Sequence, residues 1–408
     1  MSEFLTRLGT WVDTWGGRAK MARFSKGWPA TTRPGIKFYR TADVQYRYLE
    51  AGAGPTIIFT ADPPMTLEVY DALVERFSKQ FRVIVVELPA MGFSAARPGF
   101  GFGFTETSDD LALFIRNVCG NDNIFAFSCA ASLSGLDIAA RMPELASHLC
   151  FIQGGDPEAF HRWKTGRDPK GILARPVLGQ LIIKRMAPAR MPQWYRLSVG
   201  RGELIDHFCD CAKRSFGNGA MWSLASAYQI YMNHKGPLPA PTQPILSIWG
   251  NADRSHPREN VHSLAMVYDV SCVTFDDLGH TPELEDPHRV FEAIAEFVRT
   301  RQKVFPPALN AISAKAPSPI RGSRSIPAAM GTCSVSDFAS QRRIATREGC
   351  CMAGLFRRWP ITHSEFHACC KQRICRRSPS TCQRISCRLE FKGNRLKFVL
   401  NPAKLVAQ

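Results

Sequence analysis

Three residues, taken in chain order, have the types that acyl transfer requires. Ser128 supplies a hydroxyl, Asp253 a carboxylate and His280 an imidazole. In such a set the hydroxyl attacks, the imidazole takes its proton, and the carboxylate orients the imidazole and stabilises its charged form. Each residue alone is more often structural, but all three follow short apolar runs that are typical of buried strands. The sequence therefore predicts a hydrolytic site in which the three side chains meet.

The residues around Ser128 are typical of a sharp turn between a strand and a helix. The apolar run 124–127 ends in small residues, and an amphipathic segment follows. Such a turn leaves little room two residues before and after the nucleophile, and Ala126 and Ala130 occupy these positions. The following helix would offer free backbone N–H groups to an oxyanion. Ser128 is therefore the first choice of nucleophile.

The elements expected around these residues alternate between apolar strands and amphipathic helices. The strands are expected at 56–60, 82–87, 124–127, 148–153, 244–249 and 271–275, and the helices at 67–81, 105–119, up to 141, and 287–301. Apolar strands separated by helices are typical of a parallel sheet covered on both faces, which binds ligands at the carboxyl ends of its strands. The predicted fold class is α/β, with a mostly parallel central sheet, helices on both faces and an inserted helical cap.

Four parts are expected along the chain. A helix within residues 1–33 precedes an α/β core formed by 34–156 and 244–302. A helical cap or lid at 157–243 interrupts the core, because this stretch is punctuated by proline and rich in aromatic residues. It holds 13 basic residues and five acids, a charge that could attract anionic substrates. Residues 303–408 form a basic, cysteine-rich tail for which we expect disorder.

The N-terminal segment has an apolar stripe at helical spacing. Its members are Phe4, Leu8, Trp11, Val12 and Trp15. The stripe is expected to dock the helix on the body of the protein. The alternative is a helix that binds a partner, or that associates weakly with a membrane surface through residues 1–25.

Basic charge is concentrated in the tail. The net charge of the chain is +17, but residues 301–408 hold 20 of the 52 Lys and Arg residues and only four of the 35 acids. Disorder is the first interpretation of this segment, ahead of nucleic-acid binding through its charge. His363, His367, Cys369 and Cys370 are candidate zinc ligands. However, the two cysteines are adjacent in the sequence and no second pair accompanies them, which is poor spacing for a zinc site. We therefore expect no metal and no specific nucleic-acid partner.

The compartment is predicted from cysteine usage and from missing signals. Six of the 14 cysteines lie in the body, and they are scattered without the spacing of metal ligands. This distribution is typical of reduced thiols in the cytosol. Charges and tryptophans stand where a secretion signal would have an apolar block. No apolar run approaches the roughly 18 residues that a membrane span needs. We expect a cytoplasmic protein.

Residues 34–300 resemble the α/β-hydrolase superfamily, and within it the capped serine hydrolases. The most specific parts are 249–253 (Trp-Gly-Asn-Ala-Asp), similar to the family's acid turn, and 279–287 (Gly-His-Thr-Pro-Glu-Leu-Glu-Asp-Pro), similar to its histidine turn. Residues 87–94 are similar to its Asp-x-x-Gly-x-Gly-x-Ser turn, and 141–144 match the helix end after the nucleophile elbow. The resemblance implies the fold, the catalytic order and the cap.

The segment for the oxyanion hole departs from the family pattern. The family commonly has His-Gly-x-Pro after the strand, and this chain has Thr-Ala-Asp-Pro at 60–63. The backbone N–H groups of Asp62 and of Cys129, the residue after Ser128, would still form the hole. A carboxylate of Asp62 that pointed into the hole would repel the developing charge.

Two other nucleophiles stay open. Counting back from Pro143 by the family's usual spacing leads to Cys129, although Phe127 would then occupy a position that should be small. Ser132 also lies in a similar motif, deeper along the chain. No candidate is an aspartate, which argues against the dehalogenase and epoxide-hydrolase members of the family.

The function predicted from the sequence is hydrolysis of a small-molecule ester, thioester or lactone without a cofactor. Ser128 attacks, His280 acts as general base and then general acid, and Asp253 orients His280. The alternative is a non-catalytic member of the fold whose altered elbow and oxyanion segment form a binding pocket.

Overall fold

The structure, a computed structural model, describes residues 3–26, 34–234, 238–301, 369–375, 382–392 and 395–401. The chain divides into two units, Met1–Ala314 and Lys315–Gln408, which are described separately.

The first unit alternates strands and helices as expected. Its strands are β1 (Ile36–Arg40), β2 (Val44–Ala51), β3 (Thr56–Ala61), β4 (Arg82–Glu87), β5 (Met91–Gly92), β6 (Ala95–Ala96), β7 (Asn123–Ser128), β8 (Ala146–Ile152), β9 (Met221–Trp222), β10 (Ile245–Gly250) and β11 (Val270–Phe275). Its α-helices are α1 (Glu3–Thr14), α2 (Gly17–Ser25), α3 (Asp71–Phe77), α4 (Phe104–Phe114), α5 (Ala131–Arg141), α6 (Pro157–Arg167), α7 (Leu178–Ser198), α8 (Ile205–Gly217), α9 (Leu224–Gln229), α10 (Pro282–Glu285) and α11 (Pro287–Thr300). Shorter turns of helix are η1 (Leu67–Val69), η2 (Ile115–Cys119), η3 (Pro143–Leu145), η4 (Gly202–Leu204), η5 (Tyr231–Asn233), η6 (Arg258–Asn260) and η7 (Ser263–Met266).

The strands form one mixed, mostly parallel sheet. Its order is β1-β2-β4-β3-β7-β8-β10-β11, with β6 paired to β2. The pairs from β4 to β11 are parallel, and β2 pairs antiparallel with β1, β4 and β6. The predicted fold class is confirmed. Since β7 lies inside this sheet and all six of its residues are buried, its carboxyl end is held firmly from both sides.

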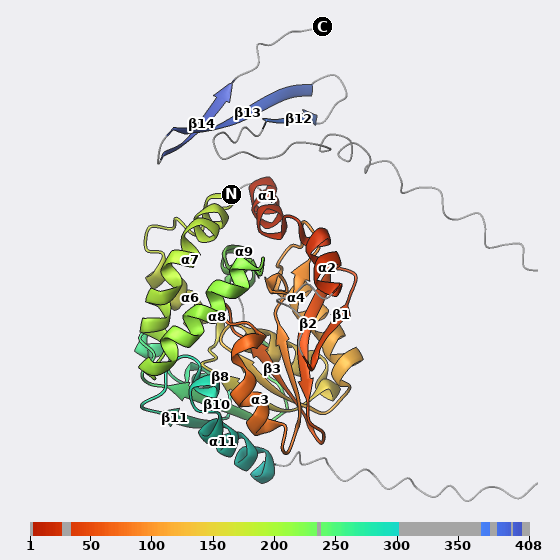
Figure 1. The fold of residues 1–408 in the computed structure, drawn as a ribbon, viewed down its shortest axis with the longest axis vertical. Coiled ribbons are helices and arrows are strands. Elements are labelled where there is room, and N and C mark those ends of the chain that lie inside the picture. The colour runs from red at the N-terminus through yellow and green to blue at the C-terminus, as the bar shows by residue number, and fades with distance from the viewer. Residues whose placement is uncertain are drawn as a thin grey trace, which may run out of the picture. The chain divides into compact units, whose positions relative to one another are not determined.

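The side chains of β7 alternate between two hydrophobic cores, as the pleat of a strand requires. Phe125 and Phe127 belong to the core under α4 and α5, and Ile124 and Ala126 to the core under α3 and α11. The helices therefore cover both faces of the sheet (Figure 1).

The helical insert expected between β8 and β10 is present as α6 to α9. Figure 1 shows α7, α8 and α9 gathered at one end of the sheet. The limits 157–243, and the other domain limits, remain predictions. No helix among the described residues is long and apolar enough to cross a membrane.

α1 docks by a different face from the one we expected. Its buried residues are Gly9, Thr10, Asp13 and Thr14, whereas Phe4 and Trp11 of the apolar stripe are exposed. The polar face docks because its partners in the body are polar groups, which hydrogen bond to Asp13 and Thr14.

In the second unit the structure describes three strands, which differs from the disorder expected for 303–408. They are β12 (Cys369–Cys375), β13 (Cys382–Lys392) and β14 (Arg395–Asn401), and they form an antiparallel sheet in that order. The alternation of Ile385, Cys387, Leu389 and Phe391 with polar residues in β13 is the period-two pattern of a strand. The rest of the tail, including His363 and His367 of the candidate zinc ligands, lies outside the described residues.

Candidate active site

The sharp turn after β7 is centred on Cys129. β7 ends at Ser128, and Cys129 has a φ of 51°, a left-handed conformation that is uncommon for residues other than glycine. The N–H of Cys129 donates to the carbonyl of Ile152 at 2.8 Å, and α5 begins two residues later. Backbone strain of this kind is often found at functional sites. The strained residue of this turn is therefore Cys129, one position after Ser128.

Ser128 points away from this turn. Its Oγ donates to Oε1 of Glu283 in α10 at 3.0 Å, and the residue is only 3% exposed. Glu283 is fully buried, and its Oε2 has no hydrogen-bond partner among the described residues. Burial raises the pKa of Glu283 to about 7, an effect that the nearby charge of Asp62 adds to and the Ser128 hydrogen bond opposes. Ser132 is also buried, in the first turn of α5.

Each ring nitrogen of His280 is hydrogen bonded to a carboxylate. Its Nδ1 lies 3.0 Å from Oδ2 of Asp253, and its Nε2 lies 3.0 Å from Oδ2 of Asp62. Its backbone N–H donates to the carbonyl of Ser198 at 2.6 Å, which holds the turn after Gly279 against the end of α7. Burial alone would lower the pKa of His280, but the charge of Asp253 and the hydrogen bonds that His280 donates to Asp253 and Asp62 raise it well above its usual value. In this arrangement the imidazole is held as a cation.

Asp253 accepts hydrogen bonds from several residues of the site. Its Oδ2 accepts from Gln153 at 3.0 Å and lies 2.9 Å from Nδ1 of His256, besides its bond to His280, and its Oδ1 accepts from the N–H of Ser255 at 2.6 Å. Burial would raise the pKa of Asp253, but the charge of His280 and the hydrogen bonds from the two histidines hold that pKa far below its usual range. Asp253 is therefore ionised, as an orienting carboxylate must be.

Cys129 lies beside His280. The Sγ of Cys129 and ring nitrogens of His256 and His280 all lie within 4.8 Å of one another. Burial, with the charge of Asp62 added, raises the pKa of the Cys129 thiol to about 11, and a hydrogen bond with His280 opposes this rise. In this conformation Cys129 is a thiol rather than a thiolate.

Sequence reasoning missed His256. Its ring stacks on that of His280, with centroids 4.6 Å apart and an interplanar angle of 2°. Trp163 of the cap also stacks on His256, with centroids 5.5 Å apart and an interplanar angle of 15°. The position of His256 three residues after Asp253 was the available signal. Because the two imidazole planes are parallel, their in-plane lone pairs do not converge on one metal ion with Cys129 in this arrangement.

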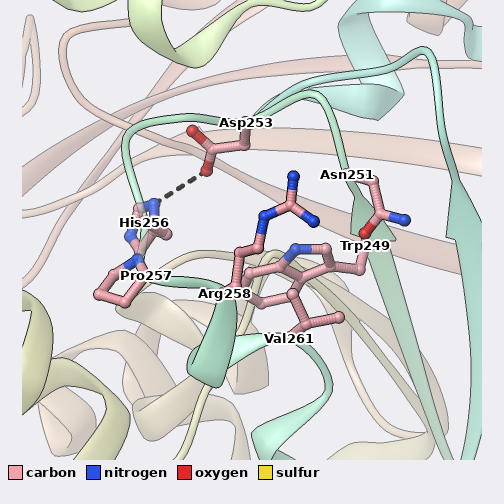
Figure 2. A pocket seen from close by; sticks show the side chains of 7 residues that line it. All are labelled: Trp249, Asn251, Asp253, His256, Pro257, Arg258 and Val261. Atoms are coloured by element: carbon pink, nitrogen blue, oxygen red, sulfur yellow. Dashed lines mark hydrogen bonds and ion pairs between the residues drawn. The ribbon is translucent and has the colours of Figure 1, made fainter.

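A cavity of about 200 Å³ lies beside Asp253 and His256. Its lining residues are Trp249, Asn251, Asp253, His256, Pro257, Arg258 and Val261. Figure 2 shows the bond from His256 to Asp253, with the Arg258 guanidinium beside Trp249. Neither Cys129 nor His280 lines this cavity, so it is not the space into which a nucleophile at the turn would attack.

Residues of the insert close the nucleophile side. Trp194 of α7 packs its ring edge to face on His280, with centroids 5.8 Å apart. The hydroxyl of Tyr231 in η5 donates to the carbonyl of Ala130 at 3.0 Å. Cys129 is only 9% exposed. Residues of the insert therefore contact both His280 and the residue that follows Cys129.

Of the predicted site residues, the structure brings together Asp253, His280, Asp62 and Cys129. It directs the Ser128 hydroxyl to Glu283 instead of His280. The Asp62 carboxylate takes the position on Nε2 of His280 that a catalytic nucleophile would need, a contact that the sequence did not predict.

One comparison with known protein families gave a match. Residues 51–293 match a sequence model of the alpha/beta hydrolase family. A search of curated proteins found no match to this chain.

Solved structures of similar fold include enzymes of several activities. A thermophilic esterase from Thermogutta terrifontis has 19% identity and a TM-score of 0.51, over 66% of this chain and 99% of its own. An N-acyl homoserine lactone degrading enzyme has 16% identity and a TM-score of 0.52, over 64% of this chain and 100% of its own. A variant of an epoxide hydrolase from Bacillus megaterium has 18% identity and a TM-score of 0.50, over 64% of this chain and 100% of its own. At these identities the likeness establishes the fold alone.

Proposed function

Because the matched residues 51–293 make up more than half of its length, the chain belongs to the alpha/beta hydrolase family, and we propose that it hydrolyses a small-molecule ester, thioester or lactone through Cys129. The observation that carries this proposal is the left-handed backbone of Cys129 at the end of β7, with its thiol beside His280. Ser128 has neither property, because it ends the strand and its hydroxyl is directed to Glu283.

The proposed reaction has two halves. The thiol proton of Cys129 passes to Nε2 of His280 while Sγ attacks the carbonyl carbon. The tetrahedral intermediate then collapses, the leaving oxygen or sulfur takes the proton from His280, and an acyl thioester remains. A water molecule, deprotonated by His280, cleaves this thioester and restores the thiol. Asp253 holds His280 in place through both halves.

The donors to the oxyanion follow from the identity of the nucleophile. With Cys129 as the nucleophile, the residue after it is Ala130, so the backbone N–H groups of Ala130 and Asp62 are the proposed donors. Ala130 is the N-cap of α5, so its N–H lies at the N-terminus of that helix, which favours negative charge. The oxyanion hole predicted from the sequence used the N–H groups of Asp62 and Cys129. In the proposal, Ala130 replaces Cys129 as the second donor.

Asp62 must release His280 before the first half can begin. A cationic imidazole that donates from both nitrogens has no lone pair to accept the thiol proton. In the proposal, the substrate carbonyl enters beside the Asp62 backbone and the Asp62 side chain turns away. Without that anionic partner the pKa of His280 falls, the Nε2 proton passes to solvent, and the lone pair of Nε2 becomes available to Cys129.

A specific observation also favours a non-catalytic role. The bond from His280 to Asp62 and the burial of Cys129 describe a site that is closed to reaction. In this second candidate the site binds a small molecule without cleaving it.

Acyl trapping tests the proposal. The protein is mixed with a p-nitrophenyl acyl ester, quenched in acid and examined by intact and peptide mass spectrometry. We expect an acyl adduct on Cys129 that is lost in Cys129→Ala and kept in Ser128→Ala. Turnover should fall by about 10³-fold or more in Cys129→Ala.

Other results of this experiment would contradict the proposal. An adduct on Ser128 or Ser132, with turnover lost in the matching alanine variant, would show that this serine is the nucleophile instead of Cys129. A folded protein that binds esters without release of p-nitrophenol or formation of an adduct would favour the non-catalytic role.

A further inference from the structure

α1 is docked on the body by its polar side. Oδ2 of Asp13 accepts from the N–H of Ser226 at 3.0 Å and from the Ser226 hydroxyl at 2.7 Å. The hydroxyl of Thr14 accepts from the N–H of Gly99 at 2.8 Å. A Cβ at Gly9 would lie 2.8 Å from the amide nitrogen of Gln180 in α7, so this glycine permits close approach of the two helices. These contacts hold the helix in one orientation.

The orientation turns the apolar side of α1 outward. Phe4 is 55% exposed, Leu8 37%, Trp11 40% and Trp15, directly after the helix, 57%. The rings of Trp11 and Trp15 contact each other edge to face, with centroids 4.1 Å apart. Single exposed apolar residues are ordinary, but four on one helical stripe of a docked helix form a patch of the kind that marks an interaction site.

The elements beside this patch are basic. α2 follows α1 directly and carries the exposed cations Arg18 and Arg23, and α7, which contacts α1, carries Arg185 and Arg190. Lys184 of α7 is engaged with α1 itself, 3.9 Å from Oδ1 of Asp13. α7 contains no acidic residue. Of the two acids in α1, Asp13 is buried, and Glu3 pairs with Arg7 at 2.8 Å.

We propose that the outward face of α1 docks on an anionic lipid surface. Tryptophan prefers the boundary between headgroups and acyl chains, and basic side chains beside an amphipathic helix are attracted to anionic headgroups. Phe4, Leu8, Trp11 and Trp15 would enter the interface, with the cations of α2 and α7 against the headgroups. The proposal does not depend on which residue is the nucleophile.

Vesicle co-sedimentation of the full chain tests this docking. One set of vesicles is phosphatidylcholine alone, and the other contains about 30% phosphatidylglycerol. The test variant is Trp11→Ser with Trp15→Ser, and the matched control is Met266→Ser with Val267→Ser. The control pair is also apolar and exposed, at 87% and 58%, but lies in and directly after η7.

We expect the wild-type protein and the control to bind the anionic vesicles alike. The tryptophan variant should bind at least about tenfold more weakly, because two large apolar side chains no longer leave water. Circular dichroism should show the same melting temperature for all three proteins, since the substituted side chains are exposed.

A comparison at two salt concentrations separates α1 from the basic tail. At about 0.5 M salt the attraction between exposed charges is strongly screened, whereas apolar insertion persists. Binding that survives salt in the wild-type protein and is lost in the tryptophan variant supports the proposal. Equal binding of the test and control variants at both salt concentrations would overturn it, as would failure of the wild-type protein to bind. Self-association that the tryptophan variant abolishes, without binding to vesicles, would assign the face to a second copy of the chain.

Discussion

The two carboxylates on His280 determine how the site should respond to pH. Asp253 and Asp62 both raise the pKa of His280, so in the folded protein the imidazole stays charged at pH values where a free histidine is neutral. A general base must be neutral, and activity should therefore appear only as pH rises through this elevated pKa.

Asp62→Asn should move the onset of activity to lower pH. The amide removes one of the two anionic partners of His280, so the pKa of His280 falls, and a neutral base is available in more acidic solution. The measurement is the pH dependence of kcat/KM for ester cleavage, with the acidic limb as the readout. An acidic limb that stays in place would show that Asp62 does not control the charge of His280.

Glu283→Gln should stabilise the protein above neutral pH. The pKa of Glu283 rises from 4.5 to about 7 on folding, so its contribution to stability is fully present below pH 4.5 and is lost as pH rises through 7. Glutamine has no such loss, and the gain at pH 8 is at most about 3 kcal/mol, because one pKa unit corresponds to about 1.4 kcal/mol.

Urea unfolding of the wild-type protein and of Glu283→Gln, at pH 5 and pH 8, measures this effect. The exposed Glu259→Gln is the control, and it should leave the difference between the two pH values unchanged. A wild-type stability that does not fall relative to Glu283→Gln between these pH values would mean that Glu283 is not protonated in the folded protein.

At the scale of elements, the sheet and its turns could be predicted, and the exact turn residue could not. The apolar runs and the segments at 249–253 and 279–287 predicted the strand ends that hold Asp253 and His280. The assignment of the turn to Ser128 rested on Phe127 being too large for the position two residues before Cys129. In the structure Phe127 lies in the core, stacked on Phe125 at 4.7 Å.

The room for Phe127 comes from a glycine in the next helix. A Cβ at Gly135 of α5 would lie 3.0 Å from the ring of Phe127 and 2.6 Å from that of Phe151. This compensation joins residues on two elements, so the spacing within the turn gave no sign of it. The orientation of the Asp62 carboxylate and the stacking of His256 on His280 depend on loop conformation in the same way.

Gly135→Ala should therefore destabilise the protein. The added methyl group overpacks two buried aromatic rings, and such changes typically cost about 1–3 kcal/mol. Gly166→Ala in α6 is the matched control, because a Cβ there meets no atom of the described residues within 4 Å. At that position alanine should stabilise by about 0.5–1 kcal/mol, since it reduces the backbone freedom of the unfolded chain.

Chemical denaturation of both variants measures the contrast. A free energy of unfolding for Gly135→Ala equal to that of the wild-type protein would show that α5 can shift away from β7 and β8. Such a shift would also move the turn, so acylation of Cys129 in the same variant reports whether the position of the helix matters to the site.

At the scale of the whole chain, the family segment and the tail differ in composition and in charge. The first unit ends with α11, whose Val290, Phe291, Ile294 and Phe297 complete the core against α3. Basic residues dominate the tail, where 20 Lys and Arg residues between 301 and 408 face only four acids. The division into two units after Ala314 coincides with this change.

Removal of residues 315–408 should leave the first unit intact. The apolar face of α11 already packs on the sheet, and β13 and β14 pair with strands of their own unit. We expect the melting temperature of the truncated protein to stay within about 2 °C of the full chain, because a loss of 1 kcal/mol would shift it by roughly that amount or more in a body of this size. Ester turnover should be unchanged, and binding to a cation exchanger should weaken strongly because most of the net charge is removed. Thermal unfolding and a turnover assay of the two forms are the measurements. A fall of more than about 5 °C, or a loss of turnover in a protein that still melts cooperatively, would make the tail part of the working hydrolase.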